Sequence, residues 1–338
     1  MKVFQKLLAL TVASALTCSL AACSSGSGGE SSGSKQNSDI TVAGVVYLED
    51  QFMKLMTTGY KAAADQYGVK FLSANVNNDQ AKETNQINTY VANGVDGIAI
   101  APLNEESSIT TLRSAASQGV KIALTDSTLN NADFIVGGYT SDQSQLGAST
   151  GSVAKKYIEE TLGGQAKIAI VQFKSLLPEK SAARVNGFKG QLEGISGVEF
   201  VADQDAWVQD DAVSVVNDIL TAHPDVNLIF AANDGGTVGA TMAVKNAGKA
   251  GSVAVFGIDA SEQIASMLQS DDNILQAVTG QDAYTMGYQS MELLIKAIQG
   301  EDTGVEAGQI LTVDGILLDR QDQEGISTFL TNLAERTK

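Results

Sequence analysis

The strongest constraint on the fold is an alternation, from Asp39 onward, of short runs rich in β-branched residues with amphipathic helical stretches. Such alternation is typical of βαβ units, in which crossover helices join parallel strands. Two series of these runs follow one another along the chain. The first predicts strands at Ile40–Tyr47, Lys70–Ala74, Gly97–Ala101, Lys121–Thr125 and Phe134–Gly138. The second predicts strands at Lys167–Gln172, Glu199–Ala202, Asn227–Ala231, Val253–Ile258 and Leu275–Val278.

Helical patterns separate the predicted strands in both series. Those of the first series lie near Phe52–Tyr67, Gln80–Asn93 and Ser107–Gln118. Those of the second lie near Lys180–Leu192, Asp210–Ala222, Gly236–Ala247 and Glu262–Gln269. Right-handed crossovers place such helices on both faces of a sheet. We therefore predict an α/β protein with two doubly wound parallel-sheet lobes.

A helix at Tyr284–Gln299 and a strand at Ile310–Leu318 remain after the second series is complete. The chain is therefore expected to cross between the lobes more than once, through a multi-strand hinge. We place the crossings at Tyr139–Ser141, at Gln281–Ala283 and near Gln309. The N-terminal lobe then comprises residues 39–140 plus 282–309, and the C-terminal lobe residues 141–281 plus 310–338. Open α/β sheets bind ligands beyond the carboxyl ends of their strands, which predicts a cleft between the lobes.

Composition and charge agree with this fold class and exclude one class of partner. Of the 338 residues, 43% are hydrophobic but only 6% aromatic, so the core must consist mainly of Ala, Val, Ile and Leu, the mixture that covered parallel sheets favour. The formal net charge of −17 opposes nucleic acid binding, which requires clustered Lys and Arg. We expect no nucleic acid partner.

The N-terminus has the pattern of a secretory signal. Lys2 and Lys6 precede an apolar run, Leu7 to Leu20, that is short for a membrane span of about 20 residues. The following Leu20-Ala21-Ala22-Cys23 resembles the bacterial lipobox, in which the Cys becomes the lipidated first residue of the mature chain. We predict a signal peptide at 1–22 and a lipid anchor with a flexible Ser/Gly-rich linker at 23–38. The mature protein is expected outside the cytoplasm, anchored to the outer face of the bacterial cell membrane.

Polar and aromatic residues follow the predicted strands of both lobes. They are Glu49, Asp50, Gln51, Phe52, Asp126 and Ser127 in the first lobe and Arg184, Trp207, Asn233, Asp234, Asp259, Gln281 and Asp282 in the second. Charged and amide groups bond pairs of hydroxyls, and a flat ring covers an apolar C–H face, so the set suits a sugar. Simpler roles stay open at this point. Asp, Asn and Ser are also favoured as helix N-caps, Trp207 suits a core, and Arg184 suits a solvated helix surface.

Several of these residues stand in motifs of one known family. Asp50-Gln51-Phe52-Met53, Leu124-Thr125-Asp126, Lys180-Ser181-Ala182-Ala183-Arg184, Phe230-Ala231-Ala232-Asn233-Asp234 and Val255-Phe256-Gly257-Ile258-Asp259 carry the resemblance. With them, almost the whole mature chain resembles the type 1 periplasmic binding proteins of the ribose and galactose/glucose branch, which are two-lobed sugar receptors.

This resemblance implies a role for each matched residue. Phe52 falls on the position of one aromatic ring and Trp207 on that of a second, so the two rings would enclose the sugar between them. Asn233 and Asp259 would bond hydroxyls, and the loop with Asp50 and Gln51 would provide a polar residue. Asp126 matches the carboxylate or amide of the fourth strand, Arg184 the Arg of the second lobe, and Gln281 the hinge amide. The candidate binding residues are Asp50, Gln51, Phe52, Asp126, Ser127, Arg184, Trp207, Asn233, Asp259 and Gln281, with Cys23 for lipidation.

Two departures leave the identity of the sugar open. Ribose binders tend to carry Arg after the Asp of the fourth strand, where this chain has Ser127. Galactose binders tend to carry His and Asp shortly before the Arg of the second lobe, where this chain has Leu176-Leu177-Pro178-Glu179-Lys180.

Patterns that suggest other chemistry are incomplete. Asp234-Gly235-Gly236-Thr237-Val238-Gly239 lacks the first Gly of a dinucleotide fingerprint and has a carboxylate where a pyrophosphate would lie. Gly147-Ala148-Ser149-Thr150-Gly151 matches a nucleophile elbow but falls in a helical stretch. The single histidine, His223, precedes Pro224 and has no metal-ligating cluster around it. We predict no catalytic residue, no cofactor and no metal.

The resemblance implies a monomeric binding protein that closes on a monosaccharide and presents it to the permease of an ABC-type importer. A receptor subunit for a membrane sensor, or a binder of another small polar ligand, remains an alternative.

Overall fold

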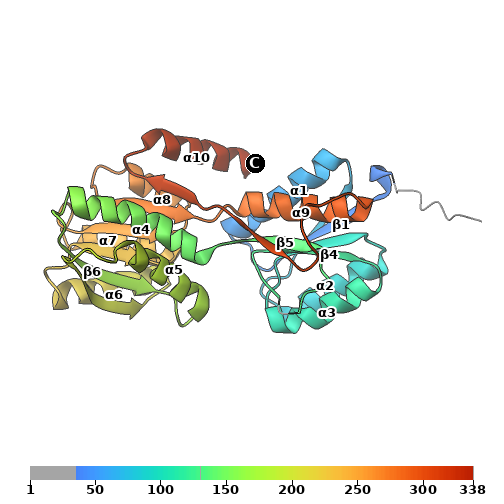
Figure 1. Cartoon of the computed structure of the whole chain (residues 1–338), viewed down its shortest axis with the longest axis horizontal. Helices are drawn as coiled ribbons and strands as arrows, with labels where there is room; N and C mark the ends of the chain where they lie inside the picture. Colours follow the sequence, from blue (N-terminus) through green and yellow to red (C-terminus); the bar gives the residue numbers. More distant parts are fainter. Residues whose placement is uncertain (1–35, 130, 338) are drawn as a thin grey trace, which may run out of the picture. The chain divides into compact units, whose positions relative to one another are not determined.

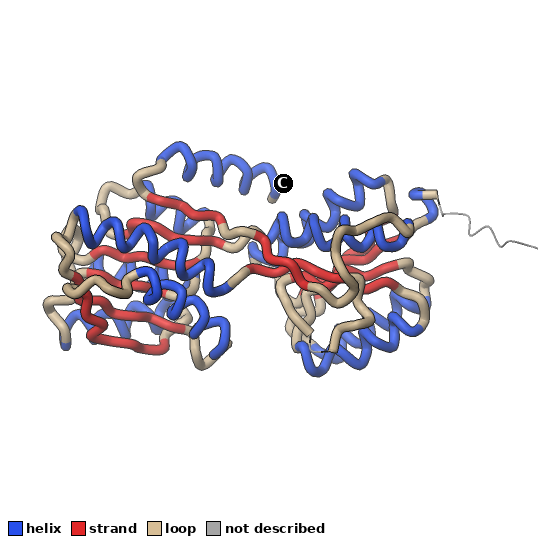
Figure 2. The backbone as a smooth tube through the Cα atoms, in the orientation of Figure 1, coloured by secondary structure: helices blue, strands red, loops and turns tan. Residues whose placement is uncertain are grey.

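The structure is a computed structural model that describes residues 36–129 and 131–337. The predicted signal peptide, Cys23 and nearly all of the linker lie outside these residues. A short 3-10 helix, η1 (Asn37–Asp39), opens the described chain. Two six-stranded sheets follow, each covered by helices on both faces (Figures 1 and 2). The predicted α/β class with two doubly wound lobes is thereby confirmed.

The first lobe has the strand order β11-β5-β4-β3-β1-β2, and all of its pairs are parallel. Helices α1 and α9 cover one face of this sheet and α2 and α3 the other (Figure 1). The strands are β1 (Thr41–Val46), β2 (Lys70–Asn75), β3 (Gly97–Ile100), β4 (Lys121–Thr125), β5 (Gly137–Ser141) and β11 (Ile310–Val313). The helices are α1 (Gln51–Tyr67), α2 (Gln80–Ala92), α3 (Glu105–Ser117) and α9 (Ala283–Gln299).

The second lobe repeats this order as β12-β10-β9-β8-β6-β7. Its pairs are parallel except for β12, which runs antiparallel to β10. The strands are β6 (Ala166–Gln172), β7 (Val198–Asp205), β8 (Leu228–Ala231), β9 (Ala254–Ile258), β10 (Leu275–Gly280) and β12 (Ile316–Asp319). The helices are α4 (Gln143–Glu160), α5 (Pro178–Gln191), α6 (Gln209–Ala222), α7 (Asp234–Asn246), α8 (Glu262–Gln269) and α10 (Gln323–Arg336).

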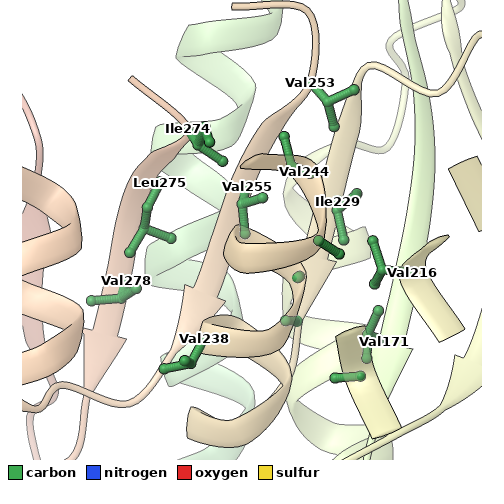
Figure 3. Packing of buried hydrophobic residues seen from close by; sticks show 14 of the residues in the cluster. Val171, Val216, Ile229, Val238, Val244, Val253, Val255, Ile274, Leu275 and Val278 are labelled. Carbon is green, nitrogen blue, oxygen red and sulfur yellow. The ribbon is translucent and has the colours of Figure 1, made fainter. Parts of the chain in front are cut away.

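Branched aliphatic side chains dominate the core, as the low aromatic content predicts. In the second lobe Val171, Ile229, Val255 and Val278 from four neighbouring strands pack under Val238 of α7 (Figure 3). All five are buried. Close-packed aliphatic layers of this kind fix the positions of the strand ends, and with them the loops that carry polar side chains.

The predicted strand at Ile310–Leu318 is wrong, because the structure divides it into two. β11 pairs with β5 in the first sheet, whereas β12 pairs with β10 in the second. Asp314-Gly315 separates them, and a side chain on Gly315 would meet Thr279 and Leu146. The third crossing therefore lies at Asp314–Gly315 and not near Gln309, and residues 310–313 belong to the first lobe. The predicted strand at Phe134–Gly138 is also displaced, since β5 begins at Gly137.

The string Gly147-Ala148-Ser149-Thr150-Gly151 lies within α4, as predicted. A side chain on Gly147 would collide with the backbone of Arg184 in α5, so this glycine serves a close helix contact. Within residues 36–129 and 131–337, none of the helices is both long and apolar enough to span a membrane.

Candidate ligand-binding site

The carboxyl ends of strands from both sheets border one cavity of about 1120 Å³. Tyr47, Asp126, Phe173, Asp259 and Gln281 each come directly after a strand and line this cavity. Its other lining residues are Asp50, Gln51, Phe52, Met53, Leu55, Leu176, Leu177, Lys180, Arg184, Asn233, Asp234, Thr241, Met242, Lys245, Ala260, Ser261, Glu262, Gln263, Ser266, Met267, Ser270 and Asp272. The two lobes thus contribute carboxylates, amides, cations and aromatic rings to a single space.

In the first lobe, Asp126 has the least satisfied polar group of the site. Its backbone has a positive φ of 54°, and its side chain is only 9% exposed. Oδ1 is buried without a hydrogen-bond partner, while Oδ2 lies 3.9 Å from Nζ of Lys180. Burial raises the pKa of Asp126, and the nearby cations Lys180 and Arg184 partly oppose this shift. Oδ1 is therefore closed to a ligand, whereas Oδ2 faces Lys180 at the cavity.

The end of the loop between β1 and α1 and the first turn of α1 place Asp50, Gln51 and Phe52 at the cavity wall. Asp50 also caps α1, since its Oδ1 accepts a 2.8 Å hydrogen bond from the backbone N–H of Met53. Tyr47, at the start of the same loop, has a raised pKa, mainly because it is buried and further because of the charges of Asp126 and Asp50.

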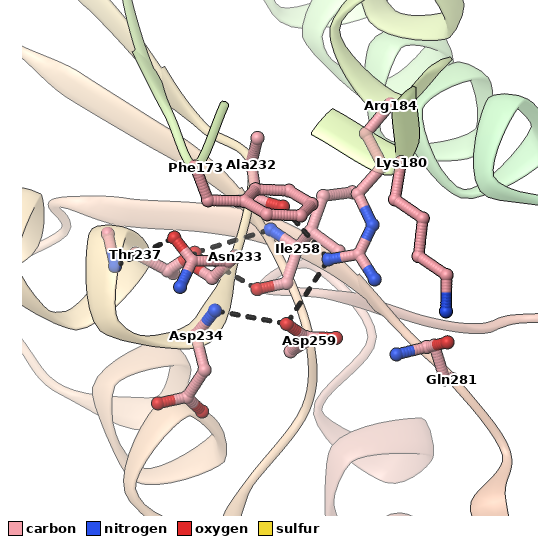
Figure 4. Close-up of polar contacts among 12 residues, drawn as sticks. Phe173, Lys180, Arg184, Ala232, Asn233, Asp234, Thr237, Ile258, Asp259 and Gln281 are labelled. Atoms are coloured by element: carbon pink, nitrogen blue, oxygen red, sulfur yellow. Dashed lines mark hydrogen bonds and ion pairs between the residues drawn. The ribbon is translucent and has the colours of Figure 1, made fainter. Parts of the chain in front are cut away.

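In the second lobe, Arg184 is held from several sides (Figure 4). Nε donates to Oε1 of Gln143 at 2.8 Å, and Nη1 donates to the carbonyl of Ala232 at 2.9 Å. Nη1 also lies 3.4 Å from Oδ2 of Asp259, and the guanidinium lies 5.1 Å from the centre of the Phe173 ring. With its side chain only 6% exposed, Arg184 is a fixed, buried cation of the binding wall.

Asp259 and Asn233 are ordered by backbone contacts at the same wall. Asp259 follows β9 with a φ of 77°, and its Oδ2 accepts a 3.0 Å hydrogen bond from the backbone N–H of Asp234. Asn233 caps α7 through the N–H of Gly236 and donates from Nδ2 to the carbonyl of Trp207 at 2.9 Å. Burial and the charge of Asp259 raise the pKa of Asp234.

Gln281 lies at the second crossing, next to a residue that the sequence analysis missed. Oε1 of Gln281 accepts a 3.4 Å hydrogen bond from Nε2 of Gln143, and Gln143 in turn holds Arg184. Gln143 is the first residue of α4, directly after the first crossing. Its position behind a predicted hinge was the signal available in the sequence.

Eight of the ten predicted binding residues line the cavity, whereas Ser127 and Trp207 do not. Ser127 is buried and donates to Oε1 of Glu105 at 2.8 Å. Trp207 is 39% exposed and contributes its carbonyl to Asn233. In this structure Trp207 therefore lies outside the cavity lining, and its predicted contact with the sugar stays a prediction. Phe173 supplies an aromatic ring from the second lobe instead, directly after β6.

The lining residues of the cavity include no His or Cys. Among the residues that the structure describes, no group of three or more His, Cys, Asp or Glu side chains is arranged to hold a metal ion. Two α/β lobes joined by three crossings, with polar groups of both lobes at one cavity, define a two-lobed ligand-binding protein.

Comparison with known proteins agrees with this class. The periplasmic binding protein domain matches residues 44–302. The ABC transporter periplasmic-binding protein YphF of Escherichia coli is 30% identical over 274 residues, which cover 79% of this chain and 83% of YphF. The ribose import binding protein RbsB of Bacillus subtilis is 25% identical over 287 residues, covering 80% and 85% of the two chains. The chain therefore belongs to the periplasmic binding protein family, and these relatives are binding proteins and not enzymes.

A solved structure shows the same fold. The periplasmic ribose ABC transporter protein from Conexibacter woesei superposes with a TM-score of 0.76 at 21% identity, covering 88% of this chain and 97% of the other. At this identity the likeness supports the two-lobed type 1 fold and not a particular ligand.

Proposed function

We propose that this chain is the solute-binding component of an ABC-type sugar importer and that it binds a monosaccharide in the cavity between its lobes. The observation that carries the proposal is the convergence of Asp126 from one lobe with Arg184, Asn233 and Asp259 from the other on a single cavity. The ribose import function in the name of the Bacillus subtilis relative supports a sugar as the ligand.

The mechanism follows from how the side chains of the two lobes are held at the cavity. Arg184 and Asp259 are held by backbone and side-chain hydrogen bonds, so the second lobe offers a preformed surface to hydroxyl groups. The first lobe offers the carboxylate of Asp126, whose Oδ2 is available to a ligand hydroxyl at the cavity wall. Rotation about the three crossings then brings the second set of partners onto the ligand, and the permease would bind the closed form.

The N-terminal segment supports an extracytoplasmic, lipid-anchored protein. The pattern Leu20-Ala21-Ala22-Cys23 and the Ser/Gly-rich stretch after it suit a lipidated cysteine on a tether. Cys23→Ser should move the protein from the membrane fraction to the medium. Unchanged membrane attachment of this variant would rule out the anchor.

A thermal-shift screen against ribose, xylose, arabinose, glucose, galactose, allose and fructose tests the ligand class, because a ligand that binds only the folded state raises Tm. Asp259→Asn should lower the affinity for the sugar that binds by about 10- to 100-fold, which is the loss expected when a charge-assisted hydrogen bond is removed. Asp203→Asn is the control, since Asp203 pairs with Lys189 and does not line the cavity. Failure of every sugar to shift Tm would reject the sugar importer and favour another small polar ligand.

A further inference from the structure

Lys180 reaches across the cavity from the second lobe to the first. It lies in the first turn of α5, and its Nζ is 3.9 Å from Oδ2 of Asp126 and 3.5 Å from the carbonyl oxygen of the same residue. Among the described residues, nothing makes a shorter polar contact with this ammonium group. Figure 4 shows the Lys180 side chain extended toward the space above Gln281, with no dashed contact to the residues drawn. The Lys180 ammonium therefore has free hydrogen-bonding capacity at a cavity wall.

Arg184 and Asp259, two other charged residues of the wall, are held by short hydrogen bonds. Arg184 bonds Gln143, the carbonyl of Ala232 and Asp259. Asp259 is further held by the backbone N–H of Asp234. By contrast, Oδ1 of Asp126 is buried without a partner. Free donors on Lys180 thus stand 3.9 Å from Oδ2 of Asp126, a separation that one hydroxyl oxygen between them can bridge, with one partner from each lobe.

We propose that Lys180 and Asp126 together recognise one hydroxyl group of the ligand, and that this pair restricts the site to neutral sugars with a free hydroxyl at that position. The inference rests on the proposed function. An ammonium group only donates hydrogen bonds and an ionised carboxylate only accepts them. A hydroxyl does both, so one hydroxyl bonds Lys180 and Asp126 at once.

The charges of the pair explain which ligands are rejected. A carboxylate in place of the hydroxyl would be attracted by Lys180 but repelled by Asp126. An ammonium group would be attracted by Asp126 but repelled by Lys180. A hydrogen or an O-methyl group would leave Asp126 without its donor, at the cost of an unpaired buried acceptor. Because the two partners lie on different lobes, this hydroxyl would also favour the closed form.

The test compares selectivity before and after one partner is removed. The neutral sugar with the largest thermal shift is titrated by calorimetry, together with its monodeoxy, monoamino and uronic acid analogues. At one ring position the wild type should prefer the hydroxyl over its deoxy and amino substitutions by about tenfold or more, and it should also prefer the parent sugar over the uronic acid, in which the terminal CH2OH is replaced by a carboxylate. Lys180→Met should lower the affinity for the parent sugar by about tenfold. It should also reduce the preference for the parent sugar over the amino analogue at that position. Asp126→Asn should instead reduce the advantage over the uronic acid.

Lys189→Met is the matched control. Lys189 lies on the same helix, its side chain is 32% exposed against 34% for Lys180, and it pairs with Asp203 away from the cavity. We expect the affinities of the Lys189→Met variant to stay within about twofold of those of the wild type, well below the roughly tenfold change expected when a charged contact is lost. Lys180→Gln, which keeps a donor without the charge, should bind the parent sugar with intermediate affinity, and it replaces Lys180→Met if that variant does not fold.

The outcomes separate the two proposals. Suppose that the wild type binds a sugar and that Lys180→Met or Lys180→Gln keeps the wild-type preferences at every ring position. This result would overturn the role of Lys180 and leave the importer function standing. A wild type that binds none of the sugars would overturn both.

Discussion

At the scale of single residues, the two carboxylates opposite one another in the cavity occupy equivalent places in the two lobes. Asp126 follows the fourth strand of the first sheet, and Asp259 follows the fourth strand of the second. Each has a positive φ, and each donates its backbone N–H to the fifth strand, Asp126 to Tyr139 and Asp259 to Thr279. Asp tolerates the left-handed conformation better than most residues. The repeated turn therefore directs a carboxylate into the cavity from each side.

Two helix caps of the molecule also lie at the cavity wall. Asp50 and Asn233 each cap a helix and each line the cavity. An N-cap uses one side-chain oxygen for the helix. The second oxygen of Asp50 and one Nδ2 hydrogen of Asn233 take no part in these bonds, so the structural and functional interpretations of these residues need not exclude one another.

The raised pKa of Asp126 predicts a pH dependence of stability in the absence of ligand. Because the folded state holds this proton more tightly than the unfolded state, the contribution of Asp126 to the free energy of unfolding falls as pH rises through the unfolded value of about 3.9 toward the raised folded value. Urea unfolding of the wild type and of Asp126→Asn from about pH 4 to about pH 7 measures this. The wild type should lose stability relative to Asp126→Asn across the range, and a pH-independent difference would contradict the assignment.

At the scale of secondary-structure elements, both lobes bring a pair of helices into close contact through glycines. In the first lobe a side chain on Gly59 of α1 would meet the backbone of Tyr284, and one on Gly287 of α9 would meet Met56. In the second lobe Gly147 of α4 faces Arg184, and Gly187 of α5 faces Ser144. Because the backbone of Arg184 forms one of these contacts, the packing of α4 on α5 also positions the buried guanidinium.

Gly147→Ala should therefore damage both the fold and the site. The added methyl group overpacks the α4–α5 contact, which we expect to cost about 1–3 kcal/mol of unfolding free energy and to weaken sugar binding by displacing Arg184. Gly190→Ala is the control on α5, since nothing lies within 4 Å of the added atom. That variant should gain about 0.5–1 kcal/mol and bind normally. Chemical denaturation and calorimetry distinguish the two, and equal behaviour would show that α5 accommodates the methyl group.

The elements also show what the sequence could and could not reveal. Hydrophobic periodicity predicted the order of strands and helices, because each buried strand is a continuous apolar run between helical patterns. It failed at Ile310–Leu318, where one apolar run serves two sheets and only Asp314-Gly315 marks the division. Proximity to strand ends indicated most of the cavity wall. Two aromatic residues of the wall were not predicted. Phe173 directly follows β6, and Tyr47 was predicted as the last residue of the first strand, whereas β1 ends at Val46.

At the scale of the whole described chain, the two lobes are linked by more than the three crossings. Gln143 after the first crossing bonds Gln281 at the second, and Gln145 lies 3.5 Å from Asp314 at the third. Gln143 also holds Arg184. The crossings and the cavity wall therefore share hydrogen bonds, so that a change of hinge geometry also displaces the Arg184 guanidinium. Sequence periodicity does not detect such a link, because it depends on side chains that only the topology brings together.

The C-terminal helix adds a further link between the lobes. Helix α10 packs on α8 and β12 of the second lobe, but Arg336 in its last turn lies 3.6 Å from Asp282 and 4.1 Å over the ring of Tyr284, at the start of α9. Asp282 is the N-cap of α9, which covers the first sheet. The last turn of α10 is therefore expected to stabilise the first turn of a helix in the other lobe.

Arg336→Ala tests this expectation by hydrogen exchange. The pair is partly exposed, so an ion pair and a cation–π contact together should contribute about 1 kcal/mol, with a correspondingly small fall in Tm. Amide exchange should nevertheless accelerate in the first turn of α9 as well as in the last turn of α10. Arg113→Ala is the control, because Arg113 pairs with Asp133 and covers the Phe134 ring within the first lobe alone. Exchange that accelerates only in α10 would mean that Arg336 stabilises its own helix and does not connect the lobes.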